Sequence, residues 1–229
     1  MKKNLLHYGL QRSGTNFMET LLLKNFRINF LNSNLDRSHP IQKHFRLYDE
    51  KHLMPDPQYN NNLTYKNFQE YIDSLGSVPH IDGVIVVSKD PYSWLTSYKK
   101  WGAKCNWPKV DHHYAEEYNL FYKKWIEFSK EDSRILFVKY LDLLTAPAEQ
   151  LVKIENELEL KKNWISKIKG IQSSLKKVSH SSAFTSNRLD YYLNKEYLED
   201  YTQGELDEIN QKIEPEIFET LGYQISTKK

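Results

Sequence analysis

The sequence predicts an α/β fold with three layers, in which helices flank a mostly parallel central sheet as in P-loop proteins. Short apolar runs alternate along the chain with longer stretches whose apolar residues recur at helical spacing. Two of these runs, Gly83–Ser88 and Arg134–Lys139, have uninterrupted apolar interiors, which is typical of parallel strands covered on both faces. A glycine-rich turn joins the first strand pattern to the first helix pattern. Such alternation predicts parallel strands connected by crossover helices.

Strand and helix patterns follow one another in a regular order. The strand patterns lie at Asn4–Tyr8, Arg27–Leu31, Lys43–Tyr48, Gly83–Ser88 and Arg134–Lys139. The helix patterns lie at 15–26, 65–75, 92–104, 112–131, 142–158 and 191–213. Between residues 49 and 76 the order is interrupted by two prolines and a run of asparagines, which predicts an inserted loop before the helix at 65–75. We expect residues 1–229 to form one domain, with this insertion at about 49–76 and a C-terminal helical segment at about 183–225.

The composition is that of a globular protein with no strong preference for a polyanionic partner. The chain has 229 residues and a formal net charge of +2, so no strong field selects nucleic acid or a membrane surface. It contains no charged-then-apolar leader and no apolar run near the length of a membrane span. The single Cys105 excludes an intramolecular disulfide, and no residues have metal-ligand spacing. We therefore expect a cytoplasmic protein that binds neither nucleic acid nor a membrane.

The turn after the first strand has the composition of an anion-binding loop. Gly9 and Gly14 lie five apart, and main-chain N–H groups at a strand-to-helix turn converge on an anion beside the positive end of the helix dipole. A nucleotide-hydrolysing P-loop has Lys followed by Ser or Thr after its second glycine. This chain has Thr15 and Asn16 there and carries its cation earlier, at Arg12. The loop is predicted to bind phosphate-like oxygens rather than a metal-bound triphosphate; an ordinary turn with glycines chosen for backbone freedom is the alternative.

A second cluster of polar residues follows the Gly83–Ser88 strand pattern. Lys89 stands at the strand end, Pro91 near the start of the next helix, and Ser97 about two helical turns further on. A cation at a strand end and a hydroxyl on the following helix can converge on an anion. Together the two clusters indicate a ligand with two separated anionic groups, although a solvated Lys89 and a neutral helical Ser97 would explain the second cluster equally well.

The chain resembles the sulfotransferases that use 3′-phosphoadenosine 5′-phosphosulfate (PAPS). Residues 11–17, Gln-Arg-Ser-Gly-Thr-Asn-Phe, are similar to the 5′-phosphosulfate loop R-S-G-[ST]-[ST]-F of carbohydrate sulfotransferases. Residues 89–97 are similar to the 3′-phosphate motif of the family, which begins R-[DN]-P and has a serine eight residues after the arginine. Val138–Leu144 resembles the signature [VLF]-x-Y-E-D-L-[LK], and residues 191–223 resemble the closing segment of bacterial members. The resemblance spans residues 4–223.

The resemblance implies a role for the residues of the two motifs. Arg12 would stabilise the bridging oxygen and the sulfonate during transfer, and Lys89 and Ser97 would hold the 3′-phosphate. Main-chain N–H groups of the loop would hold the 5′ end of the nucleotide; the residues concerned are Ser13, Gly14, Thr15, Asn16 and Phe17. Phe17 and Tyr140 would line the adenine pocket, and Arg188 would be a late basic contact to the 3′-phosphate. Family members need no metal ion, and their nucleotide product is adenosine 3′,5′-bisphosphate (PAP).

The acceptor of the sulfuryl group needs a general base. Many members of the family have K-x-H-[LF] just after a central strand, and residues 42–45, Gln-Lys-His-Phe, are similar to it. His44 is therefore the candidate catalytic base, with His39, His80 and Asp36 as alternatives. Some relatives use a carboxylate, which is the reason to keep Asp36.

The predicted function is transfer of a sulfuryl group from PAPS to a hydroxyl or amine of a carbohydrate or small-molecule acceptor. Lys89 in place of the arginine of the family keeps the charge but loses bidentate geometry, and Asn16 cannot supply the hydroxyl of a second Thr or Ser. These departures leave open a nucleoside or nucleotide kinase of the same fold and a catalytically inactive nucleotide-binding module. The sequence does not identify the acceptor, and a homo-oligomer also stays open.

Overall fold

A parallel sheet forms the centre of the protein, for which a computed structural model describes residues 2–36, 39, 41–47, 65–76, 78–107, 109–163 and 186–228. Its strands are β1 (Lys3–Leu10), β2 (Ile28–Phe30), β3 (His44–Phe45), β4 (Gly83–Ser88) and β5 (Ile135–Lys139). The order across the sheet is β2-β1-β4-β5, and the two residues of β3 pair with the carboxyl end of β1. Each of these pairs is parallel, so the prediction of a mostly parallel sheet is confirmed.

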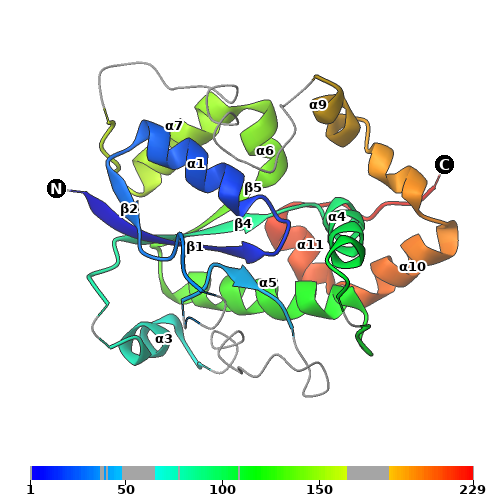
Figure 1. Cartoon of the computed structure of the whole chain (residues 1–229), viewed down its shortest axis with the longest axis horizontal. Helices are drawn as coiled ribbons and strands as arrows, with labels where there is room; N and C mark the ends of the chain where they lie inside the picture. The colour runs from blue at the N-terminus through cyan, green and yellow to red at the C-terminus, as the bar shows by residue number, and fades with distance from the viewer. Residues whose placement is uncertain are drawn as a thin grey trace.

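Helices cover both faces of the sheet (Figure 1). They are α1 (Thr15–Asn25), α3 (Phe68–Ser74), α4 (Pro91–Lys104), α5 (Tyr114–Glu131), α6 (Tyr140–Thr145), α7 (Pro147–Glu157), α9 (Ser186–Leu193), α10 (Gln203–Lys212) and α11 (Pro215–Leu221), with a 3-10 turn, η3, at Glu196–Asp200. In Figure 1, α1, α6 and α7 lie over one face, whereas α3, α5 and α11 lie over the other. α4 stands beyond the edge toward which the arrow of β1 points.

The two layers of helices bury opposite faces of the same strands. Leu5 and Leu6 are neighbours on β1, yet Leu5 packs in the core beneath α1 and Leu6 in the core against α5, because successive side chains of a strand point to opposite faces. Val86 and Val87 of β4 divide in the same way. Both faces of the inner strands are covered, which explains their uninterrupted apolar runs. The predicted three-layer α/β architecture is confirmed.

Much of the aromatic content lies in the core against α5. Trp125 is fully buried, and its ring stacks on that of Tyr8 with centroids 4.6 Å apart. Phe68 of α3 meets Phe128 of α5 at 5.8 Å between ring centroids. Because aromatic side chains bury large apolar areas, these contacts anchor α3 and α5 to each other and to the sheet.

Two of the predicted helices are interrupted. The helix predicted at 142–158 is α6 and α7, which meet at Ala146, whose φ of −133° and ψ of 56° are not helical. Pro147 is the cause, because a proline disfavours the helical conformation in the residue before it. The helix predicted at 191–213 is α9, η3 and α10, separated by Lys195 at φ 54° and by the extended Thr202. Apolar spacing continues across both breaks, so periodicity alone missed them.

Three predicted segments lie partly outside the described residues. The strand predicted at Lys43–Tyr48 contains only the two paired residues of β3, and Tyr48 is not among the described residues. Most of the insertion predicted at 49–76 is not described either, although its helix is present as α3. The description of the predicted C-terminal helical segment begins at α9. Among the residues that are described, no helix is long and apolar enough to cross a membrane.

Thr202 and Glu205 form a capping box at the start of α10. The Thr202 hydroxyl accepts from the Glu205 main-chain N–H at 3.2 Å, and the Glu205 carboxylate accepts from the Thr202 N–H at 2.8 Å. Thr202→Ala leaves the Glu205 N–H without this partner and should lower the free energy of unfolding by about 1 kcal/mol. Urea denaturation followed by circular dichroism measures the change. Thr145→Ala is the matched control, because the Thr145 hydroxyl donates to the Leu141 carbonyl and caps nothing; equal losses in the two variants would contradict the capping role.

Candidate functional site

The carboxyl ends of β1 and β4 meet at the edge of the sheet where the candidate residues lie. β1 pairs with β2 and β3 on one side and with β4 on the other, so the progression of the chain across the sheet reverses between β1 and β4. Ligands of open α/β sheets bind in the crevice beyond the strand ends at such a switch point. The glycine-rich loop follows β1, and Lys89 follows β4. The fold thus brings the two predicted clusters to neighbouring strand ends.

Two glycines allow the loop to pack tightly against its neighbours. Gly14 has a φ of 104°, and a Cβ there would lie 2.3 Å from the ring of Tyr140. A Cβ on Gly9 would lie 2.4 Å from the Ser13 Oγ and 2.6 Å from the Thr15 Cγ2. Only glycine leaves room for these contacts and adopts the left-handed backbone without strain. The loop is therefore a tight turn held between β1 and the start of α6.

Ser13 carries an orphaned polar atom in this turn. Its side chain is fully buried, and its Oγ has no hydrogen-bond partner among the described residues. A buried hydroxyl without a partner costs free energy, and the N-terminal end of α1 adds partial positive charge beside it. These features suit an anionic ligand such as a phosphate or sulfate group.

The main-chain N–H groups of the loop divide into two sets. Ser13 donates to the Leu10 carbonyl at 3.0 Å and Phe17 donates to the Gly14 carbonyl at 3.1 Å. Within the described part of the chain, the N–H groups of Gly14, Thr15 and Asn16 have no such main-chain acceptor. The N–H groups of Gly14, Thr15 and Asn16 are therefore the ones that the turn itself does not use, and the cradle of five N–H groups stays a prediction.

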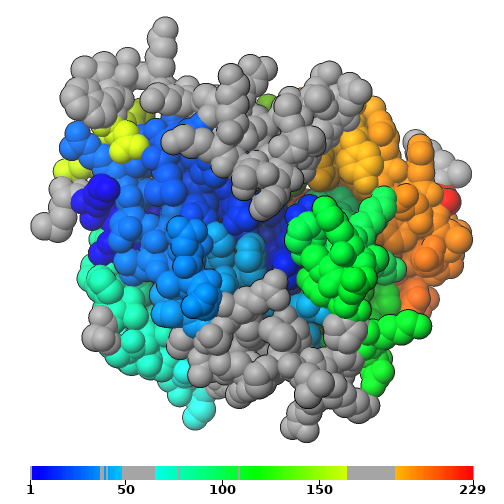
Figure 2. Space-filling view, viewed as in Figure 1, coloured from blue at the N-terminus to red at the C-terminus, as the bar shows by residue number. Residues whose placement is uncertain are grey.

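α4 is attached to the loop at two points. The Trp94 indole N–H donates to the Gln11 carbonyl at 2.9 Å, and the guanidinium of the exposed Arg12 lies over the Trp101 ring, 4.6 Å from its centroid. Ser97 precedes Trp101 by one turn, so it shares the helix face that is turned toward Arg12. In Figure 2 the green residues around the end of α4 stand in front of the blue residues of the N-terminal segment. The surface is hollowed between them. Arg12 is thus held at the side of the site by a cation–π contact.

Lys89 is a buried cation at the end of β4. Only 4% of its surface is exposed, and its ammonium lies 5.6 Å from the Tyr140 ring centroid and 5.1 Å from that of Tyr192. The Tyr118 hydroxyl donates to the Lys89 carbonyl at 2.9 Å, which fixes the main chain there. Burial of a charge is costly unless it is compensated. Aromatic faces supply part of that compensation, and the charge of Lys89 also interacts with that of the neighbouring Asp90.

The Asp-Pro pair of the second motif has a structural role. Asp90 caps α4 by accepting from the Ser93 N–H at 3.0 Å, and Pro91 is the first residue of the helix. Proline suits this position because its missing N–H would have no helical acceptor. The pair therefore starts α4 directly after Lys89.

The predicted adenine contacts Phe17 and Tyr140 pack against each other. Their rings meet edge to face with centroids 5.9 Å apart, and each residue is only 6% exposed in the core beneath α1. Tyr140 also contacts Tyr192 of α9 at 5.4 Å between centroids. Contact with adenine stays a prediction for both residues. Arg188 belongs to α9, but its side chain lies outside the described part of the chain.

His44 lies beside the loop because β3 pairs with the last residues of β1. Gly9 stands opposite His44 in the parallel register, and the Gly9 N–H donates to the Lys43 carbonyl at 3.0 Å. The His44 Nδ1 is 3.3 Å from the Thr15 Oγ1. Burial, and next the positive charge of Lys43, lower the pKa of His44 to about 3. Its imidazole is therefore neutral at neutral pH and has a lone pair that can accept a proton.

The alternative bases are less well placed. Asp36 and His39 are exposed residues of the segment between β2 and β3. The side chain of His80 is 78% exposed and precedes β4, whereas Lys89 follows that strand. The His80 carbonyl accepts from the side chain of Asn4, near the amino end of β1, at 3.2 Å. Since the strands are parallel, His80 lies at the edge opposite the loop, and this position excludes it as the base.

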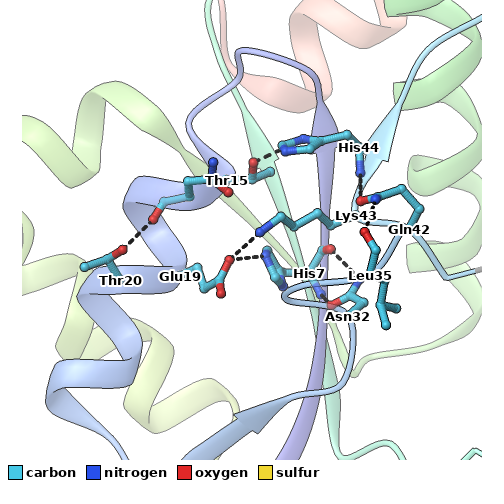
Figure 3. A network of polar contacts seen from close by, with 10 residues as sticks. His7, Thr15, Glu19, Thr20, Asn32, Leu35, Gln42, Lys43 and His44 are labelled. Carbon is cyan, nitrogen blue, oxygen red and sulfur yellow. Dashed lines mark hydrogen bonds and ion pairs between the residues drawn. The ribbon is translucent and has the colours of Figure 1, made fainter. Parts of the chain in front are cut away.

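A buried ionic network lies next to His44 (Figure 3). The Lys43 ammonium donates to the Glu19 Oε2 at 2.6 Å, and the His7 Nε2 lies 3.1 Å from the same oxygen. Asn32 exchanges hydrogen bonds of 3.1 and 2.8 Å with the main chain of His7. Burial by itself raises the pKa of Glu19, but the hydrogen bonds and charges of His7 and Lys43 outweigh it and lower the pKa to about 2. The network joins β1, α1 and β3.

No pattern in the sequence predicted this network. A lysine before His44, a glutamate in the first helix and a histidine in the first strand were visible, but their contact requires β3 to return beside β1. No local pattern encodes that return. The contact of Trp101 with Arg12 was not predictable either, because the distance between loop and helix depends on the whole sheet.

Fold and site together define a P-loop-like α/β protein whose anion-suited loop lacks the lysine of nucleotide hydrolases. Thr15 stands where that lysine would be, and it is 1% exposed and turned toward His44. In the described ranges, no group of three or more His, Cys, Asp or Glu side chains could hold a metal ion.

Comparison with solved structures finds proteins of this architecture. Mouse sulfotransferase SULT7A1 complexed with PAP matches with a TM-score of 0.50 at 12% identity, over 92% of this chain and 82% of that chain. Retinol dehydratase matches in a complex with androsterone and PAP, with a TM-score of 0.49 at 12% identity over 96% and 82% of the two chains. Its complex with retinol and PAP gives a TM-score of 0.49 at 12% identity over 99% and 84%. No protein-family model and no curated protein matches the chain.

The match to SULT7A1 shows that this chain has the fold of a sulfotransferase. It extends over most of both chains, so the resemblance predicted from the two motifs is confirmed for the fold. At 12% identity it transfers no residue role from one protein to the other. The activity of this chain therefore has to be argued from its own site.

Glu19 should make the stability of the protein sensitive to acid. Its pKa is about 2 in the folded protein against an ordinary value of 4.5, so the unfolded chain takes up this proton first as the pH falls. The stabilisation is full above pH 4.5 and is lost between there and pH 2. It amounts to about 3 kcal/mol at roughly 1.4 kcal/mol per pKa unit.

Glu19→Gln should therefore lower the free energy of unfolding at neutral pH by about 3 kcal/mol and flatten its decline in acid. Urea unfolding at a series of pH values measures both effects. Glu155→Gln is the matched control, since Glu155 pairs with Lys162 at 3.0 Å near the surface, where ion pairs contribute little. An acid dependence that is the same in Glu19→Gln and the wild type would contradict the assignment.

Proposed function

We propose that the protein is a PAPS-dependent sulfotransferase that transfers a sulfuryl group to a hydroxyl or amine of an acceptor molecule. The observation that carries the proposal is the pair of anion-suited sites at neighbouring strand ends, one at the loop around Ser13 and the other at Lys89. A nucleotide with a 5′-phosphosulfate and a 3′-phosphate carries two anionic groups of this kind. The fold shared with SULT7A1, a sulfotransferase complexed with PAP, supports the same class.

The residues of the site fit this nucleotide. The Ser13 hydroxyl and the N–H groups at the start of α1 would hold its 5′ end, which would satisfy the orphaned Oγ. Lys89 and Ser97 would hold the 3′-phosphate, because the Lys89 ammonium is a cation at the strand end next to the loop. Phe17 and Tyr140 would border the adenine, and Arg188 of α9 would add a basic contact.

The chain supplies two groups for the chemistry. PAPS, when bound, provides the activated sulfuryl group. Arg12 would stabilise the charge that develops on the bridging and sulfonate oxygens as the acceptor attacks in line. His44 would take the proton of the acceptor, and a bound anion beside it would raise the low pKa of its imidazole toward neutrality.

A kinase of the same fold is the weaker candidate. It requires a lysine after Gly14, but that position holds the buried Thr15, which contacts His44. A catalytically inactive module would bind PAP and transfer nothing to any acceptor. For the acceptor we propose a carbohydrate or another small hydroxylated molecule, because Tyr and Trp are abundant near residues 92–125; the cytoplasmic location and a homo-oligomer stay predictions of the sequence.

Calorimetric titration with PAP, run beside ATP with Mg²⁺, tests the proposed nucleotide. PAP should bind with micromolar affinity and ATP with Mg²⁺ should not. Lys89→Ala should weaken PAP binding roughly tenfold or more, because a hydrogen bond to a charged group is lost. Lys99→Ala, which removes an exposed lysine of α4, is the control and should bind like the wild type. No PAP binding, or preference for ATP with Mg²⁺, would reject the sulfotransferase and favour the kinase.

Arg12→Ala tests the chemistry. The variant should transfer the sulfuryl group roughly 100-fold more slowly, which is the scale of losing one preorganised stabiliser of developing charge. Its melting temperature should fall by no more than about 4 °C, because Arg12 is exposed and loses only its contact with Trp101. Transfer from radiolabelled PAPS to a panel of sugars, phenols, alcohols and amines measures the rate. Arg27→Ala removes an exposed arginine before β2, away from the loop, and serves as the control. Turnover of Arg12→Ala at the wild-type rate would remove the assigned role.

A further inference from the structure

Thr15 is the point at which the loop touches His44, and we infer that its hydroxyl holds His44 in the tautomer with the proton on Nδ1. The inference rests on the proposed function, within which it adds a positioning residue. A neutral imidazole has one N–H and one lone pair, and which nitrogen carries the proton is set by the hydrogen bond made there. With the proton on Nδ1, the lone pair of Nε2 is available to a substrate.

The direction of the Thr15 hydroxyl is fixed by packing. Thr15 is 1% exposed, and its Cγ2 lies only 2.6 Å from the position that a Cβ on Gly9 would occupy. Threonine is stiff about χ1, so placing the methyl group against Gly9 also places Oγ1, which lies 3.3 Å from the His44 Nδ1. Gly9 is therefore the residue whose missing side chain turns the hydroxyl toward His44.

The main chain around His44 favours the same tautomer. A hydrogen bond to the main chain of Gly9 raises the pKa of His44, which is the effect of a ring N–H that donates to a carbonyl oxygen. Gly9 is the register partner of His44, so its carbonyl lies beside the main chain of His44. Nδ1 is the ring nitrogen nearer to that main chain. Of the two residues, Thr15 has the oxygen that lies within hydrogen-bond distance of the His44 Nδ1, at 3.3 Å.

An anion in the loop strengthens the arrangement. Thr15 begins α1, beside the partial positive charge of the helix end. An anion can accept hydrogen bonds but cannot donate them, so the Thr15 hydroxyl donates to it. The hydroxyl then offers only its lone pairs to His44, and these accept from Nδ1–H. Thr15 in this way couples occupation of the loop to the protonation of the candidate base.

The tautomer decides whether His44 can act as the base. His44 takes the proton of the acceptor at Nε2 while the acceptor oxygen forms its bond to sulfur. The bond between sulfur and the 5′-phosphate oxygen breaks, and its electron pair leaves with PAP. The imidazolium keeps its Nδ1 proton, held by Thr15. In the opposite tautomer Nε2 already carries a proton and accepts none.

Nuclear magnetic resonance of the imidazole nitrogens tests the inference directly, because a protonated ring nitrogen resonates far upfield of an unprotonated one. The full-length ¹⁵N-labelled protein is measured at neutral pH with and without PAP, and His44→Gln assigns the signals. In the wild type we expect the proton on Nδ1, with and without PAP. Thr15→Val keeps the shape and the main-chain N–H but lacks the hydroxyl, so it should measurably lower the share of the Nδ1–H form. Thr15→Ser should restore it.

Each outcome of these measurements either supports or overturns the role of Thr15 in setting the tautomer of His44. A proton on Nε2 in the wild type overturns the inference even if a variant fails to fold, and so does an unchanged tautomer in a folded Thr15→Val. Calorimetry with PAP on the same samples separates the inference from the proposed function. Absence of PAP binding would reject the sulfotransferase, while the spectra without ligand would still decide on Thr15. PAP binding with the proton on Nε2 would reject only the role of Thr15.

Discussion

The close approach of the loop to its neighbours is the constraint on which the rest of the site depends. Gly9 and Gly14 lack the Cβ atoms that would collide with Ser13, Thr15 and Tyr140. Their absence lets the chain turn from β1 into α1 within a few residues. It also buries the Ser13 hydroxyl, orients the Thr15 hydroxyl and sets the N-terminal end of α1 beside both. A side chain at either glycine would displace all three features together.

The second element of the site, β3, has little support from the sheet itself. Its pairing with β1 covers two residues, so side chains must hold it in place. The Lys43–Glu19–His7 network does so by linking β3 to α1 and β1 next to His44. A buried charged pair is not by itself stabilising, because desolvation opposes the attraction. The network here serves to position β3, because this short strand has too few main-chain hydrogen bonds to hold it in place.

Aromatic rings connect the two anion-suited sites. Tyr140 contacts Gly14 and Phe17 on the side of the loop and lies 5.6 Å from the Lys89 ammonium on the other. Trp94 and Trp101 of α4 hold the loop from a different side. Rigid rings of this kind keep the cations in place before a ligand arrives, which lowers the ordering cost of binding.

The sequence by itself determined the fold class, the order of the strands along the chain and the two polar clusters, because apolar periodicity and glycine spacing are local properties. It also indicated Gly9, Arg12 and Lys89 from their places in short motifs. Only the tertiary structure decided that Glu19 pairs with Lys43, that Trp101 lies under Arg12 and that His80 faces the wrong edge. These contacts join residues distant in the chain, and they depend on how parallel strands are ordered across a sheet. That order depends on packing on both faces of the sheet, and no single segment of the sequence encodes it.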